Sequence, residues 1–226
     1  GANTTAVNFT GTATAFNWTN DNASIGLATS GTGNIGAFAA TNTGTTPVTA
    51  TITVTPVYGA CAGATDVFTI TVVPTPSVTA PSNAAFCNGV NTTAISFTGT
   101  ATHYDWTNSD GSIGLATSGT GSIPVFLAAN GGTTPVVATI TVTPRYTVGA
   151  TNCTGTPQNF TITIQPTPSV AATADQTICN GANTTAVNFT GTATAFNWTN
   201  DNASIGLATS GTGNIGAFAA TNTGTT

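Results

Sequence analysis

An internal repeat constrains the fold of this chain more than any other feature. Residues 1–46 recur without a single change as residues 181–226, a period of 180 residues. A diverged copy lies between them, since NTTAVNFTGTATAFNWTN at residues 3–20 matches NTTAISFTGTATHYDWTN at residues 91–108. Similarity at a fixed period is typical of arrays of one structural unit. The chain is therefore a series of modules of about 90 residues each.

The motif PTPSV marks the module boundaries. Its two prolines favour stiff, extended chain and cannot donate ladder hydrogen bonds, so it suits a linker. It occurs at residue 74 and again at residue 166. We predict a first module at residues 1–75 that lacks its opening strand, a complete module at 76–167, and a third at 168–226 that stops before its last strands. We expect the array to continue beyond this segment.

Alternation of apolar residues with threonine predicts β-strands. In VTATITVT at residues 48–55, the apolar side chains face one way and four threonines face the other. FTITV at residues 68–72 and FTITI at residues 160–164 repeat the pattern, which is typical of strands with one buried face. Clusters of Gly, Asn, Asp and Pro separate the strands. Shorter strands are predicted at residues 6–10, 13–18, 25–28 and 35–39.

A tryptophan occupies the same position in all three copies. Trp18, Trp106 and Trp198 alternate with polar residues on a predicted internal strand, which favours core packing over a role in stacking on carbohydrate. We therefore predict that they are core aromatics. About seven short strands per module, with a tryptophan on the third, predict an all-β fold of tandem immunoglobulin-like antiparallel β-sandwiches.

These motifs resemble a known family. The run F-x-G-T-A-T-x-[FY]-x-W-T-N, followed by IGLATSGTG, ATITVTP and FTIT, is similar to the PKD-like or immunoglobulin-like repeats of giant surface adhesins of Bacteroidota. Those adhesins are exported to the cell surface, often by the type IX secretion route, and some serve in gliding motility. The resemblance implies a sandwich fold and an adhesive or stalk function, without catalytic residues. The acidic GDG turn of ordinary PKD domains is only echoed, by SDG at residues 109–111.

Charged side chains make up 3% of the chain, where an average protein has about 25%. Arg145 is the single cationic residue, whereas binding to nucleic acid or to anionic lipid takes several. No apolar run approaches the roughly 18–20 residues that span a bilayer. We therefore expect no nucleic-acid partner and no membrane insertion.

The sequence also argues against catalysis. General acid–base chemistry needs titratable groups that act together. The single histidine, His103, is replaced by Ala15 and Ala195 in the sister copies, and no Gly-x-Ser-x-Gly motif is present. We predict that the chain is not an enzyme.

Two cysteines per complete module predict disulfides in a secreted protein. The four are Cys61, Cys87, Cys153 and Cys179. We favour a Cys87–Cys153 bridge inside the middle module. The alternative pairs Cys61 with Cys87 and Cys153 with Cys179. A zinc site is not expected, because the chain has no CxxC pair and no histidine close to a cysteine.

Asparagine suggests two further kinds of site. Sequons predict glycan attachment at Asn8, Asn17, Asn22, Asn91 and Asn159. The loops TNDNAS at residues 19–24 and TNSDGS at residues 107–112 offer oxygen ligands of the kind that calcium uses. The same residues make tight turns, so we expect turns there and no cofactor, with calcium as the weaker alternative.

We predict that the chain is a structural repeat segment of an extracellular bacterial surface adhesin or filament, acting as a stalk and self-assembling into fibres through its uncharged surfaces. Its partners would be neighbouring repeats or further copies. The alternative is a carbohydrate-binding module that recognises polysaccharide. Ice binding through threonine rows at residues 49–55 and 139–143 is a third reading. Aromatic residues that could contact a sugar are Tyr58, Tyr146, Phe38 and Phe126.

Overall fold

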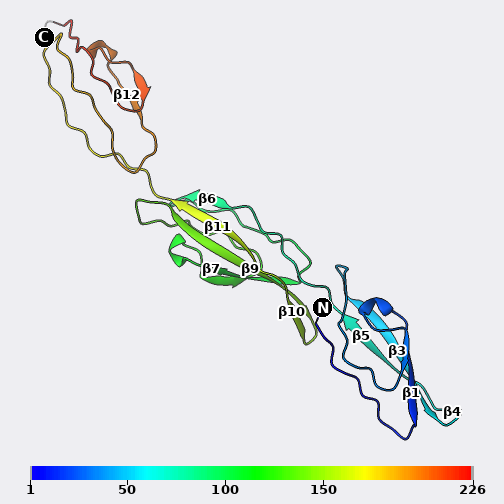
Figure 1. The fold of residues 1–226 in the computed structure, drawn as a ribbon. Helices are drawn as coiled ribbons and strands as arrows, with labels where there is room; N and C mark the ends of the chain where they lie inside the picture. Colours follow the sequence, from blue (N-terminus) through cyan, green and yellow to red (C-terminus); the bar gives the residue numbers. More distant parts are fainter. Residues whose placement is uncertain (1, 225–226) are drawn as a thin grey trace.

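The computed structural model describes residues 2–224, so the outermost residues of the predicted first and third modules lie outside it. Figure 1 shows three modules in a row, with the N-terminal one at one end of an elongated molecule. We call residues 2–75 the first module, residues 76–167 the middle module and residues 168–224 the third module. The fold class is all-β, as predicted, and nearly all strand pairs are antiparallel.

The first module contains a five-stranded sheet. Its longest strand, β3 (Val48–Tyr58), pairs with β1 (Ala15–Asn20) on one side and with β5 (Asp66–Val72) on the other. β2 (Ser30–Thr32) extends the sheet beyond β1, and β4 (Cys61–Ala62) folds back on the far end of β3. Every pairing in this sheet is antiparallel.

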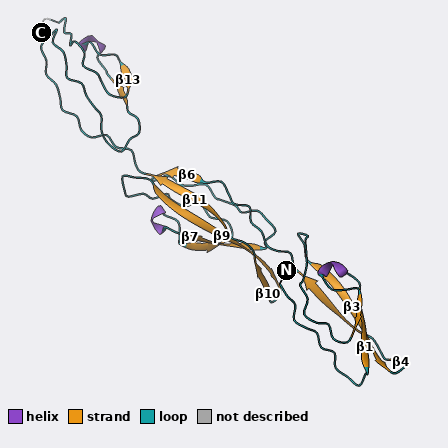
Figure 2. Ribbon diagram, viewed as in Figure 1, coloured by secondary structure: helices purple, strands orange, loops and turns teal. Residues whose placement is uncertain are grey.

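A second layer crosses this sheet without forming regular strands. Two extended segments pair through the bridges Asn3↔Ala39 and Val7↔Ile35. The Val7 and Ile35 backbones exchange hydrogen bonds of 2.8 and 3.0 Å. These segments appear as loop beside the strands in Figure 2. The strands predicted at residues 6–10 and 35–39 are therefore single bridges.

The middle module has the same plan with one strand more. β9 is its central strand, and β7, β10 and β11 pair with it in antiparallel register. β6 pairs with the outer edge of β11 in parallel register, with Ile164 opposite Phe86 and Gln165 opposite Cys87. This pair departs from the antiparallel prediction. The strands are β6 (Ala84–Cys87), β7 (His103–Asn108), β8 (Ser118–Thr120), β9 (Val136–Val148), β10 (Thr151–Thr154) and β11 (Gln158–Gln165).

The third module has little regular structure among its described residues. β12 (Asn197–Thr199) and β13 (Ser210–Thr212) form a two-stranded pair. The bridges Asn183↔Ala219 and Val187↔Ile215 repeat the second layer of the first module. No strand corresponding to β3 or β9 covers it within residues 168–224.

Alternation along the central strands builds the core. Ala138, Ile140 and Val142 of β9 are completely buried, while the threonines between them face outward. On β11, Ile162 and Ile164 are buried in the same cluster. Each such isoleucine contributes about 1.5–3 kcal/mol by leaving water. The period-two pattern of the sequence therefore identified the inward face of these strands correctly.

Each tryptophan packs over a glycine on the neighbouring strand. The register sets Trp18 opposite Gly31 and Trp106 opposite Gly119, and a Cβ atom on either glycine would collide with the indole ring. Trp18 and Trp106 are 7% and 4% exposed, as the core prediction required. The flat ring fills the space that a side chain would take, so the glycine is a packing requirement here.

The turns after β1 and β7 are each held by a buried asparagine. Asn108 is 7% exposed, and its Nδ2 donates to the carbonyl oxygens of Leu115 and Asp110 at 3.1 and 3.0 Å. Asn20 bonds Leu27 in the same way. A short 3-10 helix, η1 (Ala23–Ile25), follows in the first module. The strand predicted at residues 25–28 is therefore wrong, because Ile25 enters the core from this helical turn.

Gly119→Ala is expected to destabilise the middle module by about 1–3 kcal/mol, because the added methyl group forces the Trp106 ring to move. Hydrogen exchange of β9 and β11 measures the loss locally. Gly131→Ala is the matched control, since a Cβ there meets no atom within 4 Å. Equal protection in both variants would contradict the packing role of Gly119.

Candidate functional site

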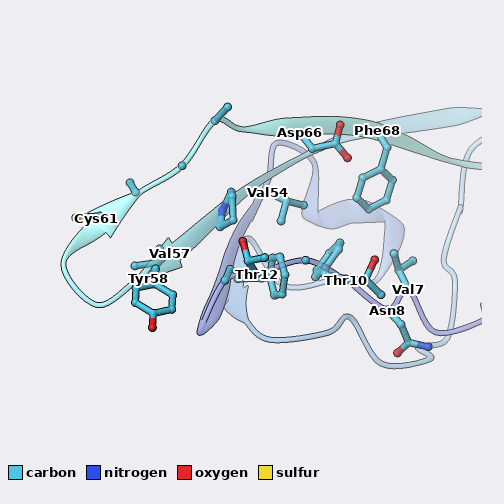
Figure 3. Close-up of a pocket in the computed structure, with 18 residues that line it drawn as sticks. Val7, Asn8, Thr10, Thr12, Val54, Val57, Tyr58, Cys61, Asp66 and Phe68 are labelled. Atoms are coloured by element: carbon cyan, nitrogen blue, oxygen red, sulfur yellow. The ribbon is translucent and has the colours of Figure 1, made fainter.

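The first module carries an open groove of about 890 Å³. One wall is the second-layer segment that includes Val7, Phe9 and Thr12, and the other is formed by β3 and β5. Figure 3 shows Val54 and Phe68 on the sheet side, facing the labelled residues of the second layer across the opening. Its lining combines apolar side chains with polar residues, which are Asn8, Thr10, Thr12 and Asp66.

In the middle module the equivalent place is filled by the chain itself. Val78, which follows the linker prolines, is 9% exposed and belongs to the core cluster with Phe97 and Phe160. The Thr79 backbone N–H donates to the Thr98 carbonyl at 2.8 Å. The linker therefore enters the module as a core segment, which the sequence did not reveal.

Two glycines admit this linker. A Cβ on Gly155 would collide with the Pro76 carbonyl, and a Cβ on Gly99 would collide with the Ser77 carbonyl. The Thr100 hydroxyl adds a bond to the Thr75 carbonyl at 3.0 Å. The linker backbone thus lies in a notch that only glycine leaves open.

The corresponding glycines of the first module face the empty groove. Gly11 aligns with Gly99, and the nearest atom to its added Cβ is a ring carbon of Phe16 at 3.9 Å. Gly63 aligns with Gly155 and has only Pro56 near it. Both positions keep the notch, and no linker segment within residues 2–224 occupies it.

In the third module, the linker contacts only the wall that corresponds to residues 98–100 of the middle module. The Ala171 N–H donates to the Thr190 carbonyl at 2.7 Å, and the Ser169 N–H donates to the Thr192 hydroxyl at 2.8 Å. Val170 aligns with Val78 but is 59% exposed, because the opposite wall is absent from the described residues. Among the described residues, the linker of the third module therefore contacts one wall only.

A second groove of about 490 Å³ lies on the third module. Ile205 is 39% exposed there, whereas its counterparts Ile25 and Ile113 are completely buried. Trp198 is likewise only partly buried, unlike the other two tryptophans. The apolar residues lining the groove are Ile178, Val187, Ile205, Leu207, Ile215 and Phe218.

The predicted Cys87–Cys153 disulfide is absent, and both thiols are free. Cys87 lies opposite Gln165, next to the third module, whereas Cys153 lies opposite Tyr146 at the other end of β9. The register separates the two levels by about 11 residues of β9, or roughly 36 Å. A disulfide requires Cα atoms about 4.4–6.8 Å apart, so this pair cannot form within the module.

The predicted glycan sites differ in accessibility. Asn8, Asn17, Asn91 and Asn159 are exposed. Asn22 is half-buried, and its side-chain oxygen accepts the Ser24 N–H at 3.1 Å as the cap of η1. Attachment at these residues stays a prediction.

The loops considered for calcium use their oxygens to bind backbone. Asp21 Oδ1 accepts the Thr51 N–H at 2.7 Å. Asp110 Oδ1 accepts the Ser112 N–H at 2.9 Å and caps η2 (Gly111–Ile113). Within residues 2–224, no three His, Cys, Asp or Glu side chains gather where a metal ion could be held. The Asp110 contact is that of a tight turn, whereas the Asp21 contact joins its loop to β3.

The aromatic residues considered for carbohydrate binding do not form a shared platform. Phe38 and Phe126 pack against the two core clusters. Tyr58 is 68% exposed, at the hairpin end of the groove, while Tyr146 is half-buried. Arg145 forms an ion pair with Asp105 across β7 and β9, and His103 lies beside it on β7.

No known protein family matches this chain, and no curated protein matches it either. Among the described residues, no helix has the length and apolar character needed to cross a membrane.

Val78→Ala is expected to cost the middle module about 1–2 kcal/mol, since it removes two buried methyl groups. Val170→Ala removes the same groups from an exposed position, so it should leave the stability of the isolated chain unchanged. Hydrogen exchange of β9 and β11 provides the measurement. Equal, small effects of both substitutions would show that the linker is not a core segment.

The lowered pKa of Asp110 predicts that the stability of the middle module depends on pH. Hydrogen bonds from the Ser112 hydroxyl and then from its backbone N–H lower the pKa of Asp110 below its ordinary value. Its contribution to stability is therefore complete above the unfolded-state pKa of about 3.9 and is lost as pH falls through the lower folded-state pKa. Relative to Asp110→Asn, the native chain should lose stability in this acid range.

Asparagine is the right comparison, because Asn22 and Asn202 make the same cap without titrating. Urea unfolding at a series of acid pH values measures the difference between the two chains. Parallel pH profiles would contradict the role of Asp110.

Proposed function

We propose that this chain is a structural repeat segment of an extracellular bacterial surface adhesin or filament, in which it acts as a stalk. The observation that carries the proposal is the junction between the first and middle modules. Pro74 and Pro76 are buried there, and the linker backbone lies against Gly99 and Gly155. A linker packed in this way holds consecutive modules in line, whereas an exposed one would let them swing.

The surface supports the same proposal. The outward faces of the strands carry threonine, and the Thr49 and Thr71 hydroxyls bond each other across β3 and β5 at 2.9 Å. With 3% charged residues, neighbouring chains repel one another little. Such surfaces suit lateral bundling of fibres.

The proposal assigns the segment to the cell exterior and gives it no catalytic role. Its partners are neighbouring repeats of the same chain or of other copies. The resemblance of its motifs to PKD-like repeats of surface adhesins is the reason for this location. Carbohydrate binding is the second candidate, and the exposed Tyr58 ring is the observation that favours it.

Electron microscopy of the native cell surface, with a label against this repeat, tests the stalk. β9 has 13 residues, so a module should repeat about every 40–45 Å along a thin fibre. Cells that lack the gene provide the control for the label. Compact labelled particles without fibres would contradict the proposal, and binding of a polysaccharide that Tyr58→Ala abolishes would then favour the second candidate.

A further inference from the structure

We propose that the first and middle modules each contain a covered self-association segment, through which an opened module joins a second copy of this chain in one continuous β-sheet. In the middle module the segment is residues 136–165, which include β9 and β11. In the first module it is residues 48–72, which include β3 and β5. We call these segments the threonine hairpins. The inference goes beyond the stalk, because it concerns what a module does after it opens.

The two strands of each threonine hairpin are self-complementary. In the middle module Thr139 lies opposite Thr161, and Ile140 lies opposite Phe160. In the first module Thr51 lies opposite Thr69. Threonine therefore meets threonine on one face, and apolar side chains meet on the other. A second copy offers the same two faces, so the cross-strand pairs that stabilise the hairpin also suit an added strand.

The inward face of the hairpin suits a dry contact between sheets. Ala138, Ile140 and Val142 of β9 are completely buried in the module, as are Ile162 and Ile164 of β11. These side chains carry no polar atoms, and side chains of this kind interdigitate between paired sheets in cross-β structures. Opening of the module exposes this face to water. A sheet built from a second copy can then bury it again.

Almost no charge opposes the stacking of identical hairpins. Arg145 is the one charged residue in residues 136–165, and Asp66 is the one in residues 48–72. Average composition would put about seven charges in the longer hairpin. Stacking of identical strands brings like charges together, and charged side chains are a common defence against such pairing. The threonine hairpins lack this defence.

Prolines limit the length of the strands that can stack. Pro135 and Pro144 flank residues 136–143, while Pro157 and Pro166 flank residues 158–165. Neither stretch contains proline, glycine or a charged side chain. Uncharged stretches of about six or seven residues with high β-propensity are the segments that form cross-β contacts. We therefore expect stacked strands of about eight residues, or roughly 26 Å.

In the folded middle module both edges of the hairpin are covered. Figure 1 shows β9 and β11 side by side, and β7 and β6 pair with their outer edges. Beyond these strands, the Thr139 N–H donates to the Ser109 hydroxyl and the Thr161 N–H donates to Asn83 Oδ1, both at 2.8 Å. The sheet ends in β6 and β8, which have four and three residues. Such short edge strands are poor templates for pairing, so the folded module does not offer the hairpin.

The hairpin is the part of the sheet that we expect to separate last. β9 and β11 are joined through β10 alone, whereas β6 and β7 pair with them across long stretches of chain. Closing a longer loop costs more chain entropy, so the distant pairs are lost first. An isolated two-stranded hairpin is only marginally stable in water. Strands from a second copy stabilise it by taking the places that β6 and β7 have left.

Two lysines test this proposal on the 226-residue chain. Thr51→Lys combined with Thr139→Lys puts one charge on the outward face of each threonine hairpin. Thr139 is exposed, and Thr51 lies beside the Asp21 carboxylate, so both folded modules should accept the change. Thr45→Lys combined with Thr133→Lys is the matched control. It adds the same charge at exposed loop positions just before β3 and β9.

Each chain is incubated at its own urea midpoint, so that differences in stability do not affect the comparison. Thioflavin T fluorescence follows assembly, and X-ray diffraction identifies the product. The native chain and the control should form fibres with spacings of about 4.7 and 10 Å. The hairpin variant should assemble at least about tenfold more slowly, because its stacked lysines repel one another.

Equal assembly rates of the two lysine variants would overturn the proposal. A native chain that stays monomeric at its midpoint, or that gives aggregates without the 4.7 Å spacing, would overturn it as well.

Trp106→Ala tests whether opening is required. Trp106 is buried in the core of the middle module, so its removal should open this module without urea. We expect assembly at least about tenfold faster than that of the native chain in the same buffer. An unchanged rate, with the middle module shown by hydrogen exchange to be open, would overturn the role of opening. Failure of these tests leaves the stalk proposal intact, because folded modules in series form a fibre without any opening.

Discussion

Burial of one face of a single long strand holds the first and middle modules together. β3 and β9 each pair on both sides and supply the apolar row against which the other segments pack. The chain contains its own comparison, because residues 181–224 repeat the sequence of residues 1–44 without such a strand. The six residues of β1 become the three of β12, and Ile25 goes from complete burial to 39% exposure at Ile205. Among the described residues, these apolar side chains are fully buried only where such a strand covers them.

Where burial alternates strictly, the sequence predicted the structure well. β3, β5, β9 and β11 fall where threonine alternates with apolar residues, since this pattern leaves one arrangement with every apolar group inside. Prediction failed where a turn carries a core residue. Ile25 is buried from a helical turn because Asn20 and Asn22 hold the backbone there. The immunoglobulin-like assignment stays a prediction, since strand pairing alone does not establish it.

The prediction also failed where residues far apart in the sequence come together in the fold. Sequence spacing suggested that Cys87 and Cys153 close one module, but it could not show that β6 joins β11 in parallel. That pairing carries Cys87 to the end of the module opposite Cys153. The groove was missed for a related reason, because PTPSV was interpreted as linker alone. Its valine, with the glycines at positions 11 and 63, was the available signal of a buried segment.

The parallel pairing of β6 with β11 also bears on how a module responds to tension. The chain enters the middle module beside the first and leaves it beside the third, so pulling the ends draws these two strands past each other along their length. All the hydrogen bonds between them are then loaded together, in shear, instead of opening one after another as in a peeled hairpin. In a chain of such modules, resistance to extension is greatest where the first and last strands of a module lie side by side.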